Sequence, residues 1–255
     1  AHGRAVQMLR QHAKQPLTIG YAPTSGIIYP ASDRPEDIEA ARKKYFSMPE
    51  DDSNWTWNVA WWSDPVLLGK YPEEGLKKYE KYLPKITEKD MRLISEPIDV
   101  YGQNIYNGRA FRMGADGNPE EVGRVPGAGK TAVNWPVTPE CLYWGPKFLY
   151  ERYKKPIYIT ENGMACHDVV SLDQRVHDPN RIDFLARYLH ELKRAAEEID
   201  LRGYFQWSLM DNFEWEKGYA ERFGIVYVDF ETQERILKDS AYWYRDVIQT
   251  NGRDL

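Results

Sequence analysis

Short apolar stretches alternate along this chain with longer segments of helical periodicity. The stretches that have the character of buried strands are residues 17–22, 98–104, 157–160 and 201–207. Helical patterns follow them over residues 34–46, from residue 138 onward, and over residues 179–198 and 240–249. Alternation of strand and helix predicts parallel strands that are joined by helical crossovers.

The clearest helical signal lies in residues 179–198. Its apolar positions recur at alternating intervals of three and four and so share one helix face: Ile182, Leu185, Leu189, Leu192, Ala196 and Ile199. Asp178 before Pro179 is typical of a helix start, because a side-chain cap precedes a residue that needs no N–H partner. Thr138 and Pro139 repeat this arrangement. We therefore expect capped helices to begin at both places.

Long polar segments follow the second and third predicted strands, over residues 110–137 and 164–177. Loops of this length in a compact unit are usually functional. The first residues have helical spacing, with Ala5, Met8 and Leu9 on one face, and they lack the apolar region and cleavage site of a signal peptide. A chain that opens inside a helix is expected to be part of a longer one.

Charge and cysteine content narrow the classes of protein that fit. The net charge is -5 and the basic residues are scattered, which argues against a nucleic acid or an anionic membrane as partner. No apolar run reaches the roughly 18 residues that a membrane span needs. Cys141 and Cys166 form no disulfide framework, so a reducing, cytoplasmic location is expected, with Cys166 as a small filler.

Metal and nucleotide motifs are missing from the sequence. The five His have no ligand-type spacing, and the Gly-rich residues 123–129 lack the spacing of a phosphate-binding loop. We therefore expect neither a metal nor a cofactor. The nine Trp are more than a core needs, and indole rings stack well on the C–H faces of sugars.

Two segments carry candidate chemistry where a predicted strand ends in polar and aromatic residues. Residues 156–163 read Pro-Ile-Tyr-Ile-Thr-Glu-Asn-Gly, and residues 204–215 read Tyr-Phe-Gln-Trp-Ser-Leu-Met-Asp-Asn-Phe-Glu-Trp. A carboxylate at the end of a buried strand is costly without a partner. Beside indole rings and further acids, Glu161 is typical of a carbohydrate site, the alternative being an ordinary ion-pair residue.

These two segments resemble the C-terminal signatures of glycoside hydrolase family 1, the retaining β-glucosidase family. The resemblance extends over nearly the whole chain and implies an α/β fold, the (β/α)8 TIM barrel, with its active site at the C-terminal ends of the strands. Only four strands are predicted, so residues 1–255 are expected to be the C-terminal half of a single barrel, strands 5–8. Open sheet edges then imply a partner, the N-terminal half of the same barrel.

The resemblance assigns the reacting groups. Glu161 is the expected nucleophile toward C1 of a β-glucoside, and Tyr106 is expected to orient it by a hydrogen bond, unless Tyr106 is an ordinary strand aromatic. The family's general acid lies in an Asn-Glu-Pro segment upstream of this chain. The pair Glu96-Pro97 precedes the second predicted strand and is expected at the opposite barrel face.

Substrate-binding roles are implied for a further set of residues: Asn104, Trp135, Trp207, Glu214, Trp215 and Phe223. Glu214 is expected to accept hydrogen bonds from the 4- and 6-hydroxyls, while Trp207 stacks and the indole N–H of Trp215 donates. Phe223 would wall the pocket. Trp135 fits the leaving-group side or, equally, a hydrophobic plug under a loop.

Neighbouring residues have plainer interpretations. Asp211 and Asn212 are expected to brace the loop, and Glu216 is expected to be a solvated surface acid. The tryptophans at 55, 57, 61 and 62 carry less weight as site candidates. Trp61 and Trp62, which are followed by Asp64-Pro65, are expected to pack a helix against the barrel, with rimming of the outer cleft as the alternative.

The leading hypothesis is a retaining exo-β-glucosidase that hydrolyses cellobiose-type oligosaccharides and aryl or alkyl glucosides, with the isolated chain inactive or weakly active. Glu214 and Glu216 would repel a phosphate, which favours an unphosphorylated sugar. The choice among glucose, galactose and fucose stays open. The alternatives are a non-catalytic sugar-binding half-barrel and a symmetric dimer of half-barrels.

Overall fold

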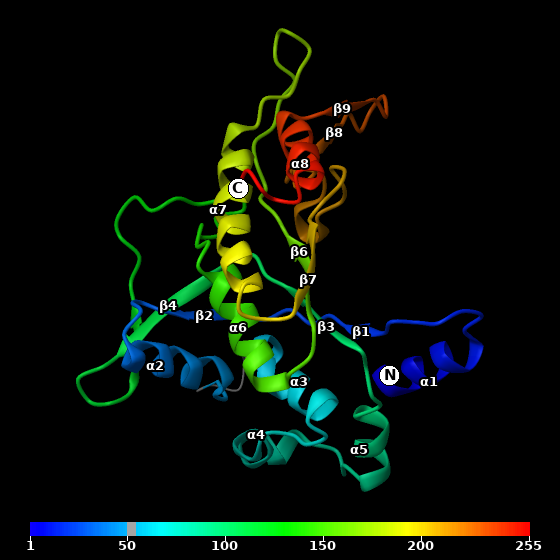
Figure 1. The fold of residues 1–255 in the computed structure, drawn as a ribbon, viewed down its shortest axis with the longest axis vertical. Coiled ribbons are helices and arrows are strands. Elements are labelled where there is room, and N and C mark those ends of the chain that lie inside the picture. Colours follow the sequence, from blue (N-terminus) through cyan, green and yellow to red (C-terminus); the bar gives the residue numbers. More distant parts are fainter. Residues whose placement is uncertain (50–54) are drawn as a thin grey trace.

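A four-stranded parallel sheet forms the centre of the computed structural model, which describes residues 1–49 and 55–255. Its order is β1-β3-β6-β7, and its strands are β1 (Gly20–Tyr21), β3 (Val100–Asn104), β6 (Ile157–Asn162) and β7 (Leu201–Gln206) (Figure 1). All neighbours are parallel. Each strand lies inside a predicted stretch or within two residues of one, and their carboxyl ends meet at one edge.

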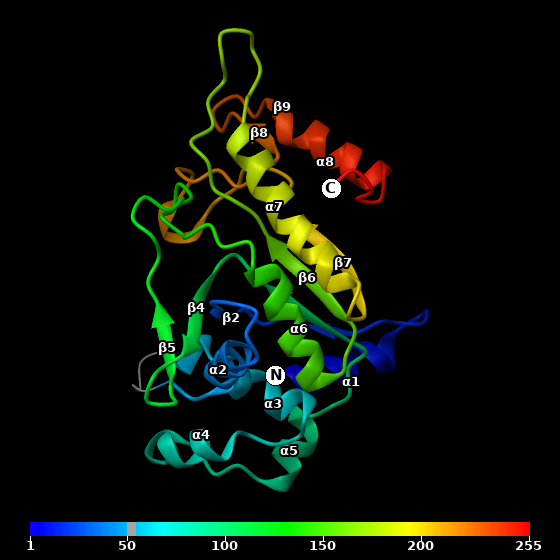
Figure 2. The ribbon, with the colours of Figure 1, turned by 60° about the vertical axis from the view of Figure 1, so that its left-hand side comes forward.

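Two crossover helices cover the outer face of this sheet. They are α6 (Cys141–Tyr153) and α7 (Pro179–Ala196), and Figure 2 shows α7 running alongside β6 and β7. The alternation of buried and partly exposed residues along β6 explains why the helices pack on this face. Ile157 and Ile159 are fully buried, while Tyr158 and Thr160 on the other face are not. Helix α8 (Asp239–Gln249) packs on α7.

A second sheet contains segments that the pattern did not predict as strands. It joins β2 (Ile27–Pro30), β4 (Gly108–Met113) and β5 (Pro119–Val122), with α2 (Pro35–Phe46) packed on it. Part of the predicted loop 110–137 is therefore a β-hairpin, whose turn contains Gly117 at φ +78°. A short hairpin of β8 (Val226–Val228) and β9 (Arg235–Leu237) precedes α8.

The remaining helices lie at the lower end of the molecule in Figure 1. They are α1 (His2–His12), α3 (Val59–Leu67), α4 (Glu73–Lys78) and α5 (Glu88–Ile94), with 3-10 turns at Trp55–Trp57 and Glu80–Tyr82. A third 3-10 turn, Trp215–Lys217, lies between β7 and β8 in the sequence. The predicted apolar face of α1 was wrong. Met8 and Leu9 are about half exposed, and Gly3 and Val6 are buried instead, where α1 meets α5.

Both predicted helix caps were wrong. The Asp178 side chain does not cap α7, because its carboxylate accepts hydrogen bonds from Arg181 and from the backbone N–H and hydroxyl of Ser240. Helix α6 begins at Cys141, and the Thr138 hydroxyl accepts from the Gly108 N–H at 2.9 Å. Tertiary partners thus replaced the local hydrogen bonds that the motif offered.

The inner face of the central sheet is hollow and partly apolar. A recess of about 360 Å³ is lined by Gly20, Val100, Gly102, Tyr158, Thr160 and Phe205, among others. Phe205 is 56% exposed, which is unusual because parallel sheets are normally covered on both faces.

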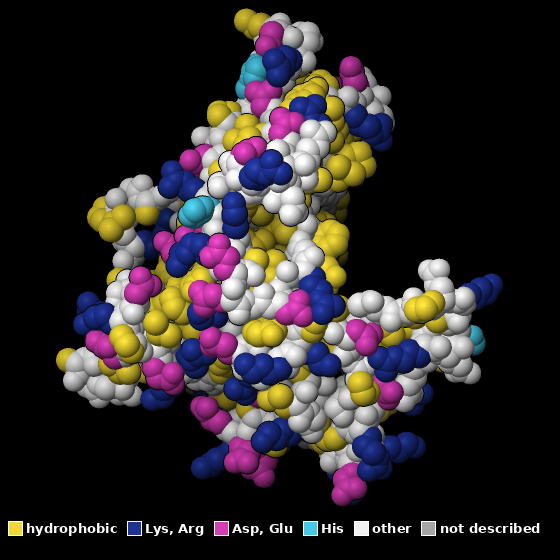
Figure 3. Space-filling view, viewed as in Figure 1, with side chains coloured by type: hydrophobic (Ala, Val, Ile, Leu, Met, Phe, Trp, Pro, Cys, Tyr) yellow, Lys and Arg dark blue, Asp and Glu magenta, His cyan; other side chains and the backbone are white. Residues whose placement is uncertain are grey.

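Acidic and basic side chains intermingle on the face shown in Figure 3, without a patch of one sign. Among the described residues, no helix has the length and apolarity that crossing a membrane requires.

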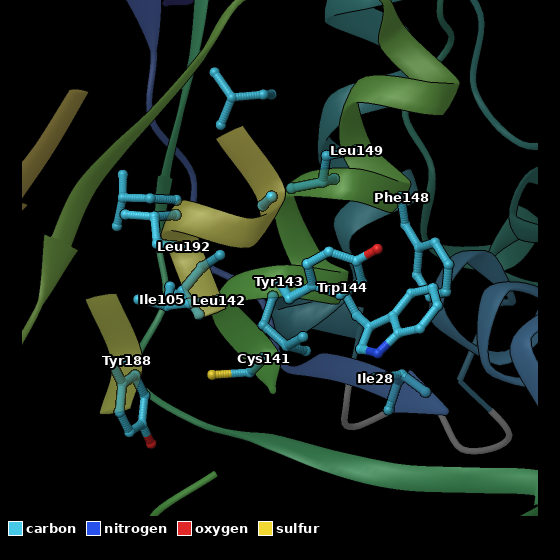
Figure 4. Close-up of a cluster of buried hydrophobic side chains, with 14 of the residues drawn as sticks. Ile28, Ile105, Cys141, Leu142, Tyr143, Trp144, Phe148, Leu149, Tyr188 and Leu192 are labelled. Atoms are coloured by element: carbon cyan, nitrogen blue, oxygen red, sulfur yellow. The ribbon is translucent and has the colours of Figure 1, made fainter. Parts of the chain in front are cut away.

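The main core fills the space between the sheet, α6, α7 and the second sheet. Figure 4 shows side chains from α6 meeting Ile28 of β2 and Leu192 of α7. Phe148 and Leu149 of α6 are fully buried. Burial of one such side chain stabilises the fold by about 1.5–3 kcal/mol, so this cluster holds α6 and α7 in place. The strand β6 lies between these two helices in the sequence.

Candidate active site

The end of β6 is built so that Glu161 faces the carboxyl edge of the sheet at a fixed place. Asn162 is fully buried, donates to the Ile105 carbonyl at 2.8 Å and accepts from the Tyr204 hydroxyl at 2.9 Å. At Gly163, a Cβ would lie 1.8 Å from the carbonyl oxygen of Trp207, so only glycine fits beside that backbone. Neighbouring strands therefore clamp the residues that follow the carboxylate.

Tyr106 donates a hydrogen bond from its hydroxyl to Oε2 of Glu161 at 2.6 Å. Burial, together with the adjacent carboxylate, holds the pKa of Tyr106 far above its ordinary value of 10, so the phenol stays a donor. Its ring lies 5.1 Å from that of Trp135 and 6.3 Å from that of Phe223. The tyrosine is thus held both by rings and by its own carboxylate partner.

A cavity of about 550 Å³ opens above this pair. The structure brings all eight predicted site residues to its wall: Asn104, Tyr106, Trp135, Glu161, Trp207, Glu214, Trp215 and Phe223. Asn104 and Glu161 lie at the carboxyl ends of β3 and β6, and the other six come from the segments that follow β3, β5 and β7. Their individual roles toward a sugar stay predictions.

The polar residues of the wall differ in how firmly they are held. Asn104 accepts a hydrogen bond from the Thr160 hydroxyl at 2.7 Å. Burial raises the pKa of Glu214, the charge of Glu161 raises it further, and a hydrogen bond with Trp207 opposes both. Phe223 is buried, whereas Trp215 is 80% exposed. The indole of Trp215 is therefore free to meet a ligand.

Sequence reasoning missed part of the wall. Residues 24–26, Trp57 and Asn107 also line the cavity. Trp57 is 57% exposed, whereas Trp61 is buried against the rings of Tyr71 and Tyr79. Trp61 is therefore buried, but in a cluster with Met48 and Tyr79 rather than against the barrel core as predicted, and Trp57 is the member of the group that lines the cavity. The signal for residues 24–26 was available, since they follow the first strand at its carboxyl end.

The residues predicted to support the loop do so. Asp211 accepts from Arg222 at 2.6 Å and from the Gly224 N–H at 3.0 Å, and the Asn212 side chain donates to the Ser208 hydroxyl at 3.0 Å. A cis peptide bond joins Trp207 and Ser208. Glu216 is exposed and pairs with Lys217, as expected of a surface acid.

Two other candidate groups lie outside this chemistry. Glu96 accepts from Gln7 on the exposed surface between α5 and α1 and does not line the cavity. Burial raises the pKa of the Cys166 thiol to about 11, which keeps it protonated near neutral pH. In the ranges 1–49 and 55–255, no group of three or more acidic, His or Cys side chains is placed to hold a metal.

The site has the architecture of a glycosidase. A hydrogen-bonded carboxylate lies among indole rings at the carboxyl edge of a half-open parallel barrel. The profile of the family described as "Glycosyl hydrolase family 1" matches residues 1–253. The chain is 44% identical over 256 residues to beta-glucosidase A of Thermotoga maritima, covering 99% of this chain and 55% of that protein. It is 40% identical over 262 residues to beta-glucosidase A of Acetivibrio thermocellus, with the same shares covered. The chain belongs to glycosyl hydrolase family 1.

The structural comparison agrees. The structure of the Thermotoga maritima beta-glucosidase in complex with glucoimidazole superimposes with a TM-score of 0.81 at 43% identity, over 98% of this chain and 55% of that one. The prediction of a (β/α)8-barrel fold is confirmed, and the described strands form part of such a barrel. The chain spans about half the length of the relatives it matches.

Proposed function

We propose that this chain supplies the nucleophile and half of the sugar pocket of a retaining exo-β-glucosidase. The observation that carries this proposal is the 2.6 Å hydrogen bond from Tyr106 to Glu161 at the floor of an indole-lined cavity. A carboxylate that is aimed by a fixed donor is prepared for attack along one direction. An ordinary ion-pair residue would face a cation instead.

The reaction proceeds by double displacement. An oxygen of Glu161 attacks C1 of the sugar, the glycosidic bond breaks, and the departing oxygen takes a proton from a general acid. A water molecule then attacks C1, the Glu161–sugar ester breaks, and the same acid/base group accepts the proton of the water. Configuration is retained because C1 is inverted twice.

We assign the general acid to a residue outside the described part of the chain. Retaining enzymes hold their two carboxyls about 5–5.5 Å apart. The carboxyls that line the described cavity are Glu161 and Glu214, and we assign Glu214 to the sugar hydroxyls. An N-terminal half-barrel would supply the acid, and it would also pair with the open edges of β1 and β7 and cover the exposed Phe205.

The substrate that fits best is an unphosphorylated β-D-glucoside, either a cellobiose-type oligosaccharide or an aryl or alkyl glucoside. Glu214 gives the cavity wall an acidic group beside Glu161, which disfavours a phosphate. A relative that is 43% identical is named 1,4-beta-D-glucan glucohydrolase, from Thermotoga neapolitana. Both cysteines are free, which is compatible with a cytoplasmic enzyme.

The test is covalent trapping in the complete barrel, with the N-terminal half supplied in the same polypeptide or in trans. A dinitrophenyl 2-deoxy-2-fluoro-β-glucoside should label Glu161, as mapped by mass spectrometry of peptides. Glu161→Gln should abolish labelling, while Glu216→Gln, a change in an exposed acid, should leave it intact. A label on any other residue would refute the assignment.

A non-catalytic sugar-binding role is the alternative. It is favoured for the chain by itself because the second carboxyl of the described cavity wall, Glu214, is assigned to the sugar hydroxyls. Turnover of cellobiose or of an aryl glucoside by the 255-residue chain alone separates the two functions. Robust turnover would exclude mere binding.

A further inference from the structure

A cluster of buried charges lies beneath the cavity, between the loops that follow β6 and β7. It consists of three cations and three carboxylates: Arg181, Arg222, Lys238, Asp168, Asp178 and Asp211. The side chains of Arg181 and Lys238 are fully buried. None of the six lines the cavity, so the proposed chemistry does not use them.

Lys238 joins the two loops through a pair of side-chain carboxylates. Its ammonium lies 2.6 Å from Asp168, on the loop after the Glu161 strand, and 2.8 Å from Asp211, on the loop that carries Glu214. Lys238 itself comes directly before α8. Asp168 also pairs with Arg181 and Asp211 with Arg222, but Lys238 is the cation that lies between the two carboxylates and screens their mutual repulsion away from water.

The hydrogen bonds of Asp211 connect this ion-pair cluster to the cavity wall. Asp211 accepts from the Gly224 N–H at 3.0 Å, directly after the wall residue Phe223. The neighbouring carbonyl of Arg222 accepts from Arg181 at 2.8 Å, and Arg181 also holds Asp168 at 2.7 Å. Both sides of Phe223 are thus fixed by the cluster.

Stability alone does not account for such a cluster. Replacing buried ion pairs by apolar side chains is often neutral or stabilising, whereas removal of one partner is costly. Charged side chains supply a fixed geometry that apolar side chains do not, because hydrogen bonds between ions are directional.

We propose that Lys238 is a positioning residue for the sugar pocket, which holds the loop of residues 207–225 in place relative to Glu161 by bridging Asp168 and Asp211. The inference rests on the proposed function. It predicts that Lys238 controls how well the enzyme distinguishes a glucoside from its 6-deoxy analogue, because Glu214 reads the 6-hydroxyl from this loop.

The test compares variants of the complete barrel. Lys238→Met leaves three buried carboxylates with only two cations, Arg181 and Arg222, and endangers folding. The decisive variant is therefore the double change Lys238→Met with Asp168→Asn, which removes the bridge and keeps the cluster neutral. Lys238→Arg keeps a cation between the carboxylates. The matched control is Asp64→Asn, which breaks a buried ion pair with Arg152 between α3 and α6, away from the cavity.

The measured quantity is the ratio of kcat/KM for an aryl glucoside over the aryl 6-deoxyglucoside. The double variant should lose about tenfold in this ratio, the effect of one hydrogen bond to a charged group, and Lys238→Arg should retain most of it. Asp64→Asn should lower Tm and leave the ratio unchanged. A folded double variant with the wild-type ratio, or equal losses in Lys238→Arg and the double variant, would overturn the inference.

Labelling of Glu161 in the wild type separates this result from the proposed function. If the fluoro-glucoside does not label wild-type Glu161, the proposed function itself fails. If the wild type is labelled and the double variant keeps the wild-type ratio, only the role of Lys238 fails.

Discussion

Replacing Tyr106 by Phe removes one hydroxyl from the candidate active site and little else. The lost interaction is the 2.6 Å hydrogen bond to Glu161. A hydrogen bond to a charged group contributes about 1.5–3 kcal/mol, and each 1.36 kcal/mol in a barrier changes a rate about tenfold. The ring contacts with Trp135 and Phe223 at 5.1 and 6.3 Å remain available to Phe. We therefore expect kcat/KM to fall by about 10–150-fold at little cost in stability.

The assay is the kcat/KM of the complete barrel with dinitrophenyl β-glucoside, together with the rate at which the fluoro-glucoside labels Glu161. An activated leaving group makes the first displacement independent of the general acid, so both readouts report on the nucleophile. Tyr153→Phe is the matched control, because Tyr153 also donates to a buried carboxylate, that of Asp64 at 2.8 Å, but away from the cavity.

Tyr153→Phe should lower Tm and leave both rates unchanged. If the kcat/KM of Tyr106→Phe stays within about twofold of the wild type, below the effect of one charged hydrogen bond, Tyr106 is an ordinary core aromatic and the reasoning fails.

Two further changes test the geometry around the site. Gly163→Ala should lower kcat/KM by about 100-fold, because its Cβ would lie 1.8 Å from the Trp207 carbonyl oxygen and the backbone must shift; a displacement of about 1 Å can have this effect. Gly123→Ala is the control and should leave kcat/KM unchanged, since its Cβ meets open space. Equal activities of the two variants would contradict the predicted clash. His177 lies between Asp239 at 2.6 Å and Asp173 at 3.0 Å, and the hydrogen bond to Asp239, then that to Asp173, raises its pKa above 6.5. The stabilisation of the fold by protonated His177 should therefore be complete below pH 6.5 and disappear as the pH rises through the folded-state pKa. A Tm difference between wild type and His177→Asn that does not shrink with rising pH would refute this prediction.

The local pattern was enough to predict where the strands and the candidate site lie. Apolar residues on both faces marked β3 and β6 as buried strands, and parallel topology places the ends of such strands together. Glu161, Trp207 and Glu214 were identified for this reason and through the motifs around them. Tyr106 and Glu161 are 55 positions apart, yet sheet geometry alone brings their strand ends to one edge.

The local pattern failed where a residue's environment depends on distant parts of the chain. The β4–β5 hairpin is polar and exposed on one face, so residues 110–122 have the composition of a loop. Asp178 has the sequence of a helix cap, but Ser240 and Arg181 take its carboxylate. A cap is a weak local preference, and buried cations outcompete it.

The sequence by itself determined the alternation of strands and helices and the segments that carry the candidate site, because these depend on periodicity and on motifs within single segments. The barrel, the nucleophile candidate and the class of ligand followed from the resemblance of those motifs to a known family. Only the tertiary structure decided that Arg181 and Lys238, which look like surface residues in the sequence, are fully buried between three carboxylates. Ionic residues carry no periodic signal of burial, and the partners of Lys238 lie 70 and 27 positions away in the chain. Such pairs exist only once the strands have set the loops side by side.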